Sequence, residues 1–312
     1  MTAETASWVV HDLIAAPGVA AAVQDVLAPA VEQLTTAGAT HRFVFQTVES
    51  GGRLRAWFHL ADPGAQEAVR HELDRRLASY GQERLTPPPD RQRPPVLLDG
   101  TPRVVRWQEE HLAITSALAL RMLLEGLDGA GHDSQVLSFL LANRTHGLRR
   151  PAELRARSEA LVAADGLEDM LSSAELNTEF AAGRRDFVAL LRGIWTLPKG
   201  GDGATLGPSQ GSPSNPGSPY APGSCDEGFW ALGAWMNATQ HLPARLTGTV
   251  GASRAPAAVA SEVHLLRLLD GYTALMGNRL GVSGRRHRML LALAAASVRA
   301  LVPTPRSGGA HR

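Results

Sequence analysis

The stretch that decides the fold is HRFVFQTVESGGRLRAWFHL, residues 41–60. Two segments in it, Arg42 to Val48 and Arg53 to Leu60, are rich in β-branched and aromatic residues, which favour strands. Between them lies Glu49-Ser50-Gly51-Gly52. A short glycine-containing connection between two strand-like runs indicates a β-hairpin. The sequence therefore predicts an antiparallel pair of strands.

The residues on either side predict further elements of the same α+β unit. Ser7 to Ile14 is rich in β-formers and predicts a strand, and Pro17 to Thr36 carries apolar residues at helical spacing. Asp62 can cap a following helix, with Pro63 at its first position and its body running to about Ser79.

The rest of the chain changes from mixed to helical patterns. Leu85 to Pro95 is dense in proline and predicts an extended connection, and Arg103 to Trp107 predicts another short strand. Helical spacing then covers Glu110–Leu127, Asp133–His146, Pro151–Leu161, Glu175–Trp195, Cys225–His241, Ala255–Leu280 and Ser283–Leu301. A sheet with helices followed by a mostly helical remainder is an α+β fold. We expect an α+β part over residues 1–107 and a helical part over residues 108–302.

Two segments are predicted to lack regular structure. Residues 199–224, KGGDGATLGPSQGSPSNPGSPYAPGS, are almost devoid of apolar groups and cannot bury enough surface to offset their ordering entropy. We expect a flexible loop there, and a disordered tail over residues 303–312.

Composition excludes several classes of partner. The 31 basic and 30 acidic residues give a formal net charge of +1, whereas proteins that bind nucleic acid usually carry a clear basic excess. No secretory signal begins the chain, and the longest apolar run, Met289 to Val302, is interrupted by Arg299 and too short to span a bilayer. We therefore predict a cytoplasmic protein with no nucleic-acid or membrane partner. The sequence leaves the oligomeric state open, a homodimer included.

Common catalytic motifs are missing from the sequence. It has no Walker A loop, no GxGxxG after a strand, no HExxH and no GxSxG. Its eleven histidines are scattered, and the single cysteine, Cys225, rules out a multi-cysteine zinc site. We predict no metal site.

Three segments, in order, resemble the thiopeptide-type bacteriocin biosynthesis family, which also occurs as the C-terminal elimination domain of class I lanthipeptide dehydratases. The first comprises Trp8 to Gly38 and the hairpin, where residues 53–58, RLRAWF, resemble the family's "HLRLRF" strand. The second is RVVRWQEEHL, residues 103–112, at the family's "Y-x-P-E" region. The third is LLDGYTALMGNRLGVS, residues 268–283, which matches the family's "HM-x-x-NRLG" helix at Asn278-Arg279-Leu280-Gly281. The resemblance implies an elimination-domain-like α+β fold.

The departures from this pattern concern charge. Members that eliminate glutamate use two arginines on the second strand, an arginine after "Y-x-P-E" and the histidine of "HM". Here Arg55 matches the first arginine, but Trp57 stands at the second, residues 111–114 contain no arginine, and Ala274 replaces the histidine. An arginine fork is what would bind a leaving glutamate carboxylate, so elimination is disfavoured.

The chain is more similar to stand-alone pyridine synthases of the family. The resemblance implies a formal aza-(4+2) cycloaddition between two dehydroalanines of an azole-bearing precursor peptide, followed by loss of water and of the leader peptide. One alkene is the dienophile, and the other, with a neighbouring amide as its iminol, is the 2-azadiene. This reaction requires no metal or redox cofactor, and we predict none. The predicted partner is the azole- and dehydroalanine-containing precursor peptide with its leader. The pocket is predicted between the sheet and the C-terminal helices, near Tyr272.

Holding the two alkenes together should supply most of the rate, because good orientation can be worth ~7–11 kcal/mol while general acid–base help gives about 10²–10⁴-fold. Candidate catalytic residues are Tyr272 as donor or acid, Glu110 as base or acceptor, and Gln108 as an orienting amide. The candidate substrate-binding residues are Arg55, Trp57, Asn278, Arg279 and His264.

Each candidate also has a purely structural interpretation. Tyr272 has the spacing of a half-buried core tyrosine, and Glu110 could favour a helix N-terminus at a strand-to-helix junction. Gln108, like Glu109, has the residue type of a solvent-facing position. Asn278 and Arg279 could simply end their helix, with Gly281 as its terminator, and Trp57 could be core.

Two other functions remain open on the sequence. One is the glutamate-eliminating, dehydroalanine-forming lyase of the same family. The other is a non-catalytic scaffold that binds the leader peptide and recruits a partner enzyme.

Overall fold

The computed structural model describes residues 8–14, 18–48, 53–62, 64, 66–79, 93–98, 101–126, 129–196, 230–240 and 262–303. Its strands are β1 (Trp8–Ile14), β2 (Thr40–Val48) and β3 (Arg53–Leu60). The helices of the first third are α1 (Val19–Ala22), the π-helical turn η1 (Val23–Leu27), α2 (Ala28–Thr36) and α3 (Gln66–Ser79). Those of the remainder are α4 (Pro102–Leu124), α5 (Gly129–Thr145), α6 (Pro151–Asp165), α7 (Glu168–Leu171), α8 (Ala174–Thr196), α9 (Trp230–Gln240), α11 (Glu262–Arg279) and α12 (Gly284–Leu301). The predicted α+β fold is confirmed.

The sheet is antiparallel with the strand order β1-β3-β2. β2 and β3 pair as the hairpin pattern predicted, with Phe45 opposite Ala56 and Gln46 opposite Arg55. The four turn residues, 49–52, lie outside the described residues. β3 is the central strand, paired on both edges, and it carries the longest unbroken run of buried residues in the sheet, 54–58.

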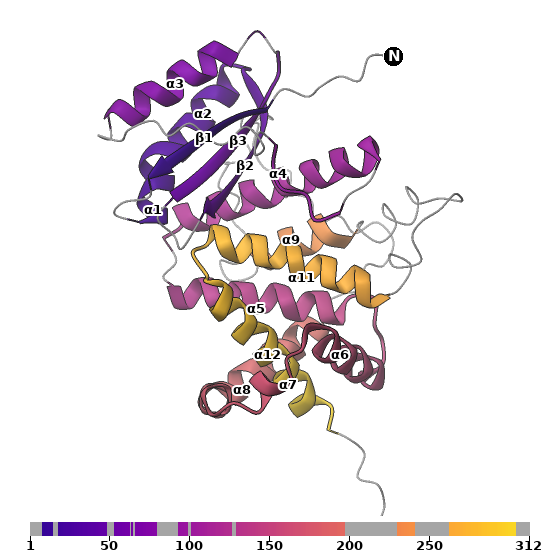
Figure 1. Ribbon diagram of the computed structural model, residues 1–312. Helices are drawn as coiled ribbons and strands as arrows, with labels where there is room; N and C mark the ends of the chain where they lie inside the picture. Colours follow the sequence, from indigo (N-terminus) through magenta and orange to yellow (C-terminus); the bar gives the residue numbers. More distant parts are fainter. Residues whose placement is uncertain are drawn as a thin grey trace, which may run out of the picture.

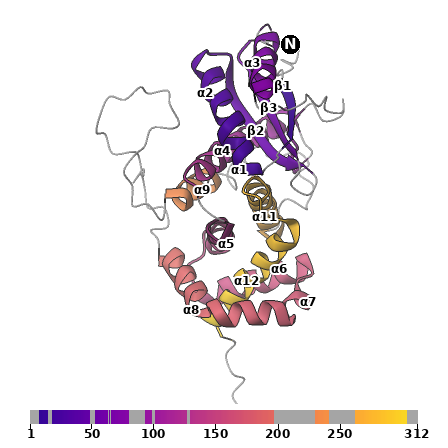
Figure 2. The same ribbon diagram turned by 90° about the vertical axis from the view of Figure 1, so that its left-hand side faces the viewer.

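Helices surround this sheet. α1, α2 and α3 pack against it, and α4 and α11 contact its edge strand β2 (Figure 1). Figure 2 shows α5 end-on in the middle of the helical part, and it packs against α8, α9, α11 and α12. The core is therefore continuous from the sheet through α4 and α11 to α5.

One predicted element is wrong. Residues 103–107, expected as a strand, form the first turns of α4, which begins at Pro102 with Thr101 as its N-cap residue. Proline is favoured at the first helical position because its missing N–H needs no partner there. The boundary expected between residues 107 and 108, where the α+β part was to end, therefore lies inside α4. This error has consequences for the site, because it changes which side chains face inward.

Most other helix predictions agree with the structure within a few residues at each described end. The helix expected over residues 17–36 is present from Val19 and contains η1. α3 begins at Gln66, and Asp62 instead accepts a hydrogen bond from the Gly64 N–H (2.9 Å), while Pro63 is outside the described residues. The expected loop at 199–224 and all but the first residue of the 303–312 tail also fall outside them.

Candidate functional site

Arg55, the arginine that matches the first arginine of the family's strand motif, forms a buried pair with an aspartate of the neighbouring strand. Arg55 Nε and Nη2 donate to Asp12 Oδ1 (2.5 Å) and Oδ2 (2.6 Å), across the register pair that joins β3 to β1. Both side chains are buried. The Trp57 ring centroid lies 5.9 Å from Arg55 Cζ, and Trp57 is 1% exposed, so it is a core residue of the sheet. A fork already engaged with a carboxylate is not available to a second one.

The end of α11 is tied to β2 by the other two matched residues. Arg279, fully buried, donates from Nε to the Phe45 carbonyl oxygen (2.6 Å) and from Nη1 to Thr115 Oγ1 (2.9 Å). Burial lowers the pKa of Arg279 to about 9. Asn278 exchanges hydrogen bonds with the Thr47 backbone, accepting at 2.8 Å and donating at 3.2 Å. Gly281 follows in the left-handed region (φ 81°) and ends the helix, as the structural interpretation of this motif predicted.

Gln108 and Tyr272 are in direct contact. The Tyr272 hydroxyl donates to Gln108 Oε1 (3.2 Å), and Gln108 is 0% and Tyr272 1% exposed. Burial raises the pKa of Tyr272, which keeps the hydroxyl protonated. The rings of Trp107 and His111, also on α4, lie edge-on to Tyr272 with centroids at 6.4 and 4.4 Å. The solvent-facing interpretation of Gln108 is wrong, whereas Tyr272 is a core residue, as its structural interpretation predicted, although it is fully rather than half buried.

Two neighbouring carboxylates on α4 have different surroundings. Glu110 Oε1 lies 3.3 Å from Arg42 Nη2 and 3.8 Å from Arg106 Nε, with its side chain 32% exposed. Because α4 starts at Pro102, Glu110 does not stand at a strand-to-helix junction. Glu109, predicted to face solvent, is 7% exposed, and burial raises its pKa against the opposing effects of Arg93 and Trp8. The sequence did contain a signal for this burial. Thr101-Pro102 marks the start of a helix, and the inward face of that helix includes Gln108 and Glu109.

On the other side of α11 lies a cavity of about 590 Å³, here called the α11 cavity. Its walls come from the 93–98 segment, the end of α6, the residue before α7, α11 and α12. They are Leu97, Leu98, Asp165, Leu167, His264, Leu265, Arg267, Leu268, Asp270, Gly271, Ala274, His287, Arg288 and Leu291. Ala274, which stands where the family has its histidine, is among them. Of the site residues predicted from sequence, only His264 lines the α11 cavity; Arg55, Glu110 and Tyr272 do not.

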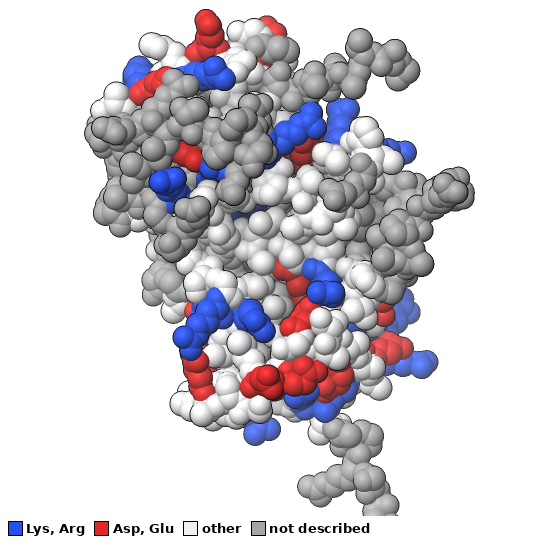
Figure 3. Space-filling view, in the orientation of Figure 1, with Lys and Arg blue, Asp and Glu red and all other residues white. Residues whose placement is uncertain are grey.

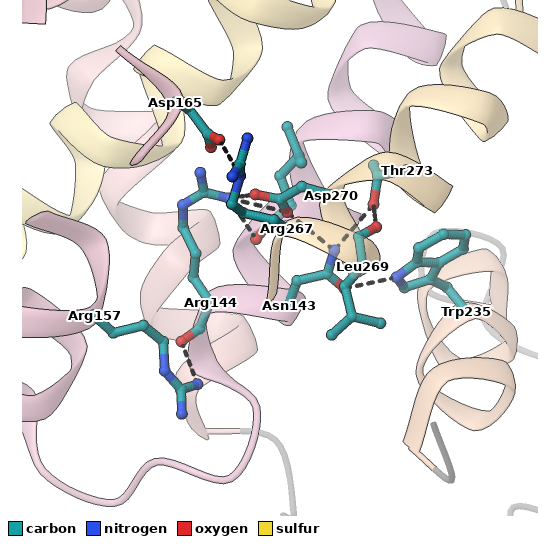
Figure 4. A network of polar contacts seen from close by, with 10 residues as sticks. Asn143, Arg144, Arg157, Asp165, Trp235, Arg267, Leu269, Asp270 and Thr273 are labelled. Carbon is teal, nitrogen blue, oxygen red and sulfur yellow. Dashed lines mark hydrogen bonds and ion pairs between the residues drawn. The ribbon is translucent and has the colours of Figure 1, made fainter. Parts of the chain in front are cut away.

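Asp270, in the wall of the α11 cavity, belongs to a network of buried polar groups (Figure 4). Asp270 lies 3.4 Å from Arg144 Nη1 on α5, and Asn143 Nδ2 donates to Thr273 Oγ1 (3.0 Å) and to Asp270 Oδ1 (3.4 Å). Trp235 Nε1 on α9 in turn donates to Asn143 Oδ1 (3.1 Å). Within the described part of the chain, Arg144 Nε and Nη2 have no hydrogen-bond partner although Arg144 is 0% exposed.

Burial shifts two titratable groups of the cavity wall, Asp270 and His287, towards their neutral forms. It raises the pKa of Asp270, with Arg144 opposing the shift. It lowers the pKa of His287 to about 4, and Arg144 adds to that effect. Sequence reasoning missed this network because its partners are distant in sequence: Arg144 and Asp270 are 126 residues apart.

The rim of the α11 cavity is charged. Arg267 Nε donates to Asp165 Oδ1 (3.0 Å), and Arg157 pairs with Glu262 nearby. Arg288 is exposed and has no ion-pair partner among the described residues. On the face drawn in Figure 3, charged side chains gather above and below a central band of mostly uncharged surface.

Two features are absent from the described residues, a cluster of metal ligands and a membrane-spanning helix. No group of three or more histidine, cysteine, aspartate or glutamate side chains in the described residues could hold a metal ion. None of the helices described is both long and apolar enough to cross a membrane.

Comparison with known proteins identifies the fold class of this chain. No protein-family model matches the sequence, and no curated protein matches it significantly. Solved structures do match, and they define an α+β fold of the lanthipeptide-dehydratase elimination-domain type. The resemblance drawn from the sequence is thereby confirmed at the level of the fold.

Three particular structures carry this result. The pyridine synthase TbtD from thiomuracin biosynthesis aligns with a TM-score of 0.62 and 17% identity over 95% of this chain and 99% of that one. TsrL aligns with a TM-score of 0.60 and 15% identity over 94% and 95%. The tRNA-dependent lantibiotic dehydratase MibB from Microbispora sp. 107891 aligns with a TM-score of 0.59 and 15% identity over 96% of this chain, which corresponds to 28% of MibB.

Proposed function

We propose that this protein modifies a ribosomally made precursor peptide and, specifically, that it is a thiopeptide pyridine synthase. The fold shared with TbtD over nearly the full length of both chains supports the class. The observation that carries the specific reaction is the α11 cavity, whose leucine walls enclose Ala274 in place of the family's histidine. The leucine walls suit azoles and alkenes, while Arg267 at the rim is already paired with Asp165.

The proposed reaction balances without an oxidant. Two carbon–carbon bonds form between the iminol azadiene and the second dehydroalanine. The hydroxyl of the former iminol carbon then leaves as water, and the leader leaves as its amide from the former dienophile. Each departure removes one ring proton, and the two new double bonds complete the aromatic pyridine.

The cavity walls would do most of the work by holding the two alkenes in contact, an orientation effect of ~7–11 kcal/mol at best. Tautomerisation of the amide to its iminol needs a donor and an acceptor. Asp270 and His287 both line the cavity, and a carboxyl group and an imidazole can serve as donor and acceptor. This assignment replaces Glu110, which faces Arg42 on the β2 side of α4.

Glutamate elimination has less support. Arg55 is paired with Asp12, and Arg279 is bound to Phe45 and Thr115, so a leaving carboxylate would have to bind elsewhere, at exposed Arg288 on the rim of the α11 cavity.

The direct test is to incubate the purified protein with a bis-dehydroalanine azole peptide that carries its leader, and to follow the products by mass spectrometry. We expect loss of water together with release of the leader. New dehydroalanine from a glutamylated peptide would instead identify the eliminating lyase. Tight leader binding without any change in peptide mass would identify a scaffold.

Two variants locate the reaction. Ala274→Phe fills the α11 cavity and should abolish turnover, whereas Glu110→Gln alters only the β2 side of α4. Reduced turnover in Glu110→Gln combined with full turnover in Ala274→Phe would move the reaction to the sheet side, where the sequence first predicted it.

A further inference from the structure

We propose that Leu97 and Leu98 form a fixed wall of the α11 cavity that selects flat, apolar heteroaromatic rings of the peptide, and that Gln108 is the residue that positions this wall. The inference rests on the proposed function and deepens it, because it names what the cavity recognises. It is carried by three contacts that converge on one short segment.

The first contact is a clamp on the backbone of the wall. Gln108 Oε1 accepts hydrogen bonds from the N–H groups of Leu97 and Leu98, both at 2.9 Å, and Gln108 Nε2 donates to the Leu98 carbonyl oxygen at 2.7 Å. One side chain therefore satisfies three backbone groups of a segment that has no regular secondary structure. Removing it would leave those groups to find other partners, so the position of the wall depends on this amide.

The second contact holds the clamp itself. The Tyr272 hydroxyl donates to the same Gln108 Oε1, and both side chains are buried. An amide with its oxygen and nitrogen both engaged has one orientation, because a flip would place like groups together. The Oε1 and Nε2 atoms of Gln108 are thus both bonded within the protein, so Gln108 affects a ligand only by positioning Leu97 and Leu98.

The third contact shows how closely the wall approaches α11. A Cβ atom built on Gly271 would lie 2.9 Å from Leu97 Cδ1, closer than carbon atoms pack. Gly271 is in the interior of a helix, where glycine is intrinsically unfavourable, so the absent side chain serves the approach of Leu97. The width of the cavity at this point is set by Gly271 and Leu97 together.

The shape and polarity of the wall indicate the ligand. Leu97 is 38% exposed, and it lines the cavity with Leu268 and Leu291. A planar ring laid against these leucines would cover the exposed part of Leu97, and an azole of the precursor peptide has that form. A hydrophobic pocket discriminates by size at the level of about 10–200-fold for a single methylene.

The test uses Gly271→Ala, a change that favours the helix but adds a methyl group where α11 meets Leu97 Cδ1, so that the Leu97 side chain must move. The probe is a linear peptide with consecutive thiazoles and no dehydroalanine, which can bind but cannot react. We expect its dissociation constant to rise about tenfold or more in Gly271→Ala, and to rise also in Leu97→Ala, which removes the apolar surface that the ring would cover. In turnover with the reactive peptide, Gly271→Ala should raise KM and leave kcat nearly unaltered.

Gly277→Ala is the matched control on the same helix. Its Cβ would meet its nearest neighbour, Val282, at an ordinary 3.5 Å, so binding of the probe should stay as in the parent protein. Equal weakening in the two glycine variants, or no weakening in either, would overturn the proposal. Hydrogen exchange gives an independent measurement: Gln108→Ala should accelerate exchange of the Leu97 and Leu98 amides, and unchanged protection would remove the positioning role.

These outcomes separate the two proposals. If the parent protein binds the thiazole probe with the predicted dependence on Gly271 but never closes a ring, the wall stands and the pyridine synthase assignment falls. If it closes the ring and Gly271→Ala is without effect, the assignment stands and the wall falls.

Discussion

Two regions contain buried charge but satisfy it differently: the sheet with its contacts to α4 and α11, here called the interface, which holds Arg55 and Arg279, and the surroundings of the α11 cavity. At the interface, Arg55 binds Asp12 through two short hydrogen bonds, and Arg279 reaches both a backbone carbonyl and a hydroxyl. At the cavity, Arg144 stays 3.4 Å from Asp270 and keeps two nitrogen atoms without a partner within the described residues.

Buried polar groups are nearly always satisfied, so an exception in a native fold calls for a reason. The well-paired charges hold β1 to β3 through Arg55, and α11 to β2 and α4 through Arg279. Of the loosely paired charges, Asp270 lines the α11 cavity, and Arg144 pairs with it from α5. The proposed recognition site is thus on the side of α11 where polar groups are less completely satisfied, and four predictions test this difference, from the largest effect to the smallest.

Removing Asp12 should have the largest effect. Asp12→Ala leaves the Arg55 guanidinium buried without its partner, and such a loss costs about 3–5 kcal/mol of unfolding free energy. Urea denaturation followed by circular dichroism measures it. The matched control, Asp12→Leu with Arg55→Met, removes both charges and should be far less destabilised. Equal losses in the two proteins would show that the pair is not what stabilises the interface.

The second prediction concerns pH at the α11 cavity. His287 has a folded pKa of about 4 against 6.5 as its ordinary value, so the unfolded chain binds this proton more readily. Stability should then fall as the pH decreases from about 6.5 to 4, by about 1.4 kcal/mol per unit and about 3 kcal/mol in total.

His287→Gln serves as the reference, because it keeps Asp270, whose raised pKa acts in the opposite direction over the acidic range. Subtracting the two unfolding free energies at each pH isolates the histidine. A difference that does not change with pH would mean that His287 is protonated equally in both states.

The third prediction returns to the link between α11 and β2. Asn278→Ala removes both hydrogen bonds to the Thr47 backbone and should cost about 1–3 kcal/mol. Asn278→Asp keeps the acceptor for the Thr47 N–H and loses only the donor, so it should be less destabilised. The reverse order, by thermal or urea unfolding, would contradict the assigned geometry.

The smallest effect is expected at Glu110. Its ion pair with Arg42 joins two partly exposed side chains, and pairs of this kind contribute about 0–1 kcal/mol. Glu110→Gln should therefore shift the urea midpoint little, and less still at high salt. A loss of several kcal/mol would place Glu110 among the structural charges of the interface.

The sequence predicted the fold wherever local patterns were strong. The hairpin over residues 42–60 and the helix that ends before Gly281 follow from strand-forming residues and from glycine chemistry, and both are present. The strand expected at 103–107 is absent because Thr101-Pro102 is a helix start signal, and these residues form the first turns of α4.

The site was harder to predict for a physical reason. Gln108 and Tyr272 were named as candidates, yet their contact joins α4 to α11 across 164 residues, and no local pattern reveals such a pair. The same holds for Arg144 with Asp270. Arg55 had the right residue type for binding a carboxylate, but Asp12 on the neighbouring strand is that carboxylate.

The central claim, that recognition occurs on the cavity side of α11, is tested most directly by a crystal structure with the unreactive thiazole peptide bound. We predict density for the rings between Leu97, Leu268 and Ala274, with the Arg55–Asp12 pair unchanged. Density for the rings against Arg55 and Trp57 on the sheet, with the α11 cavity empty, would contradict the account.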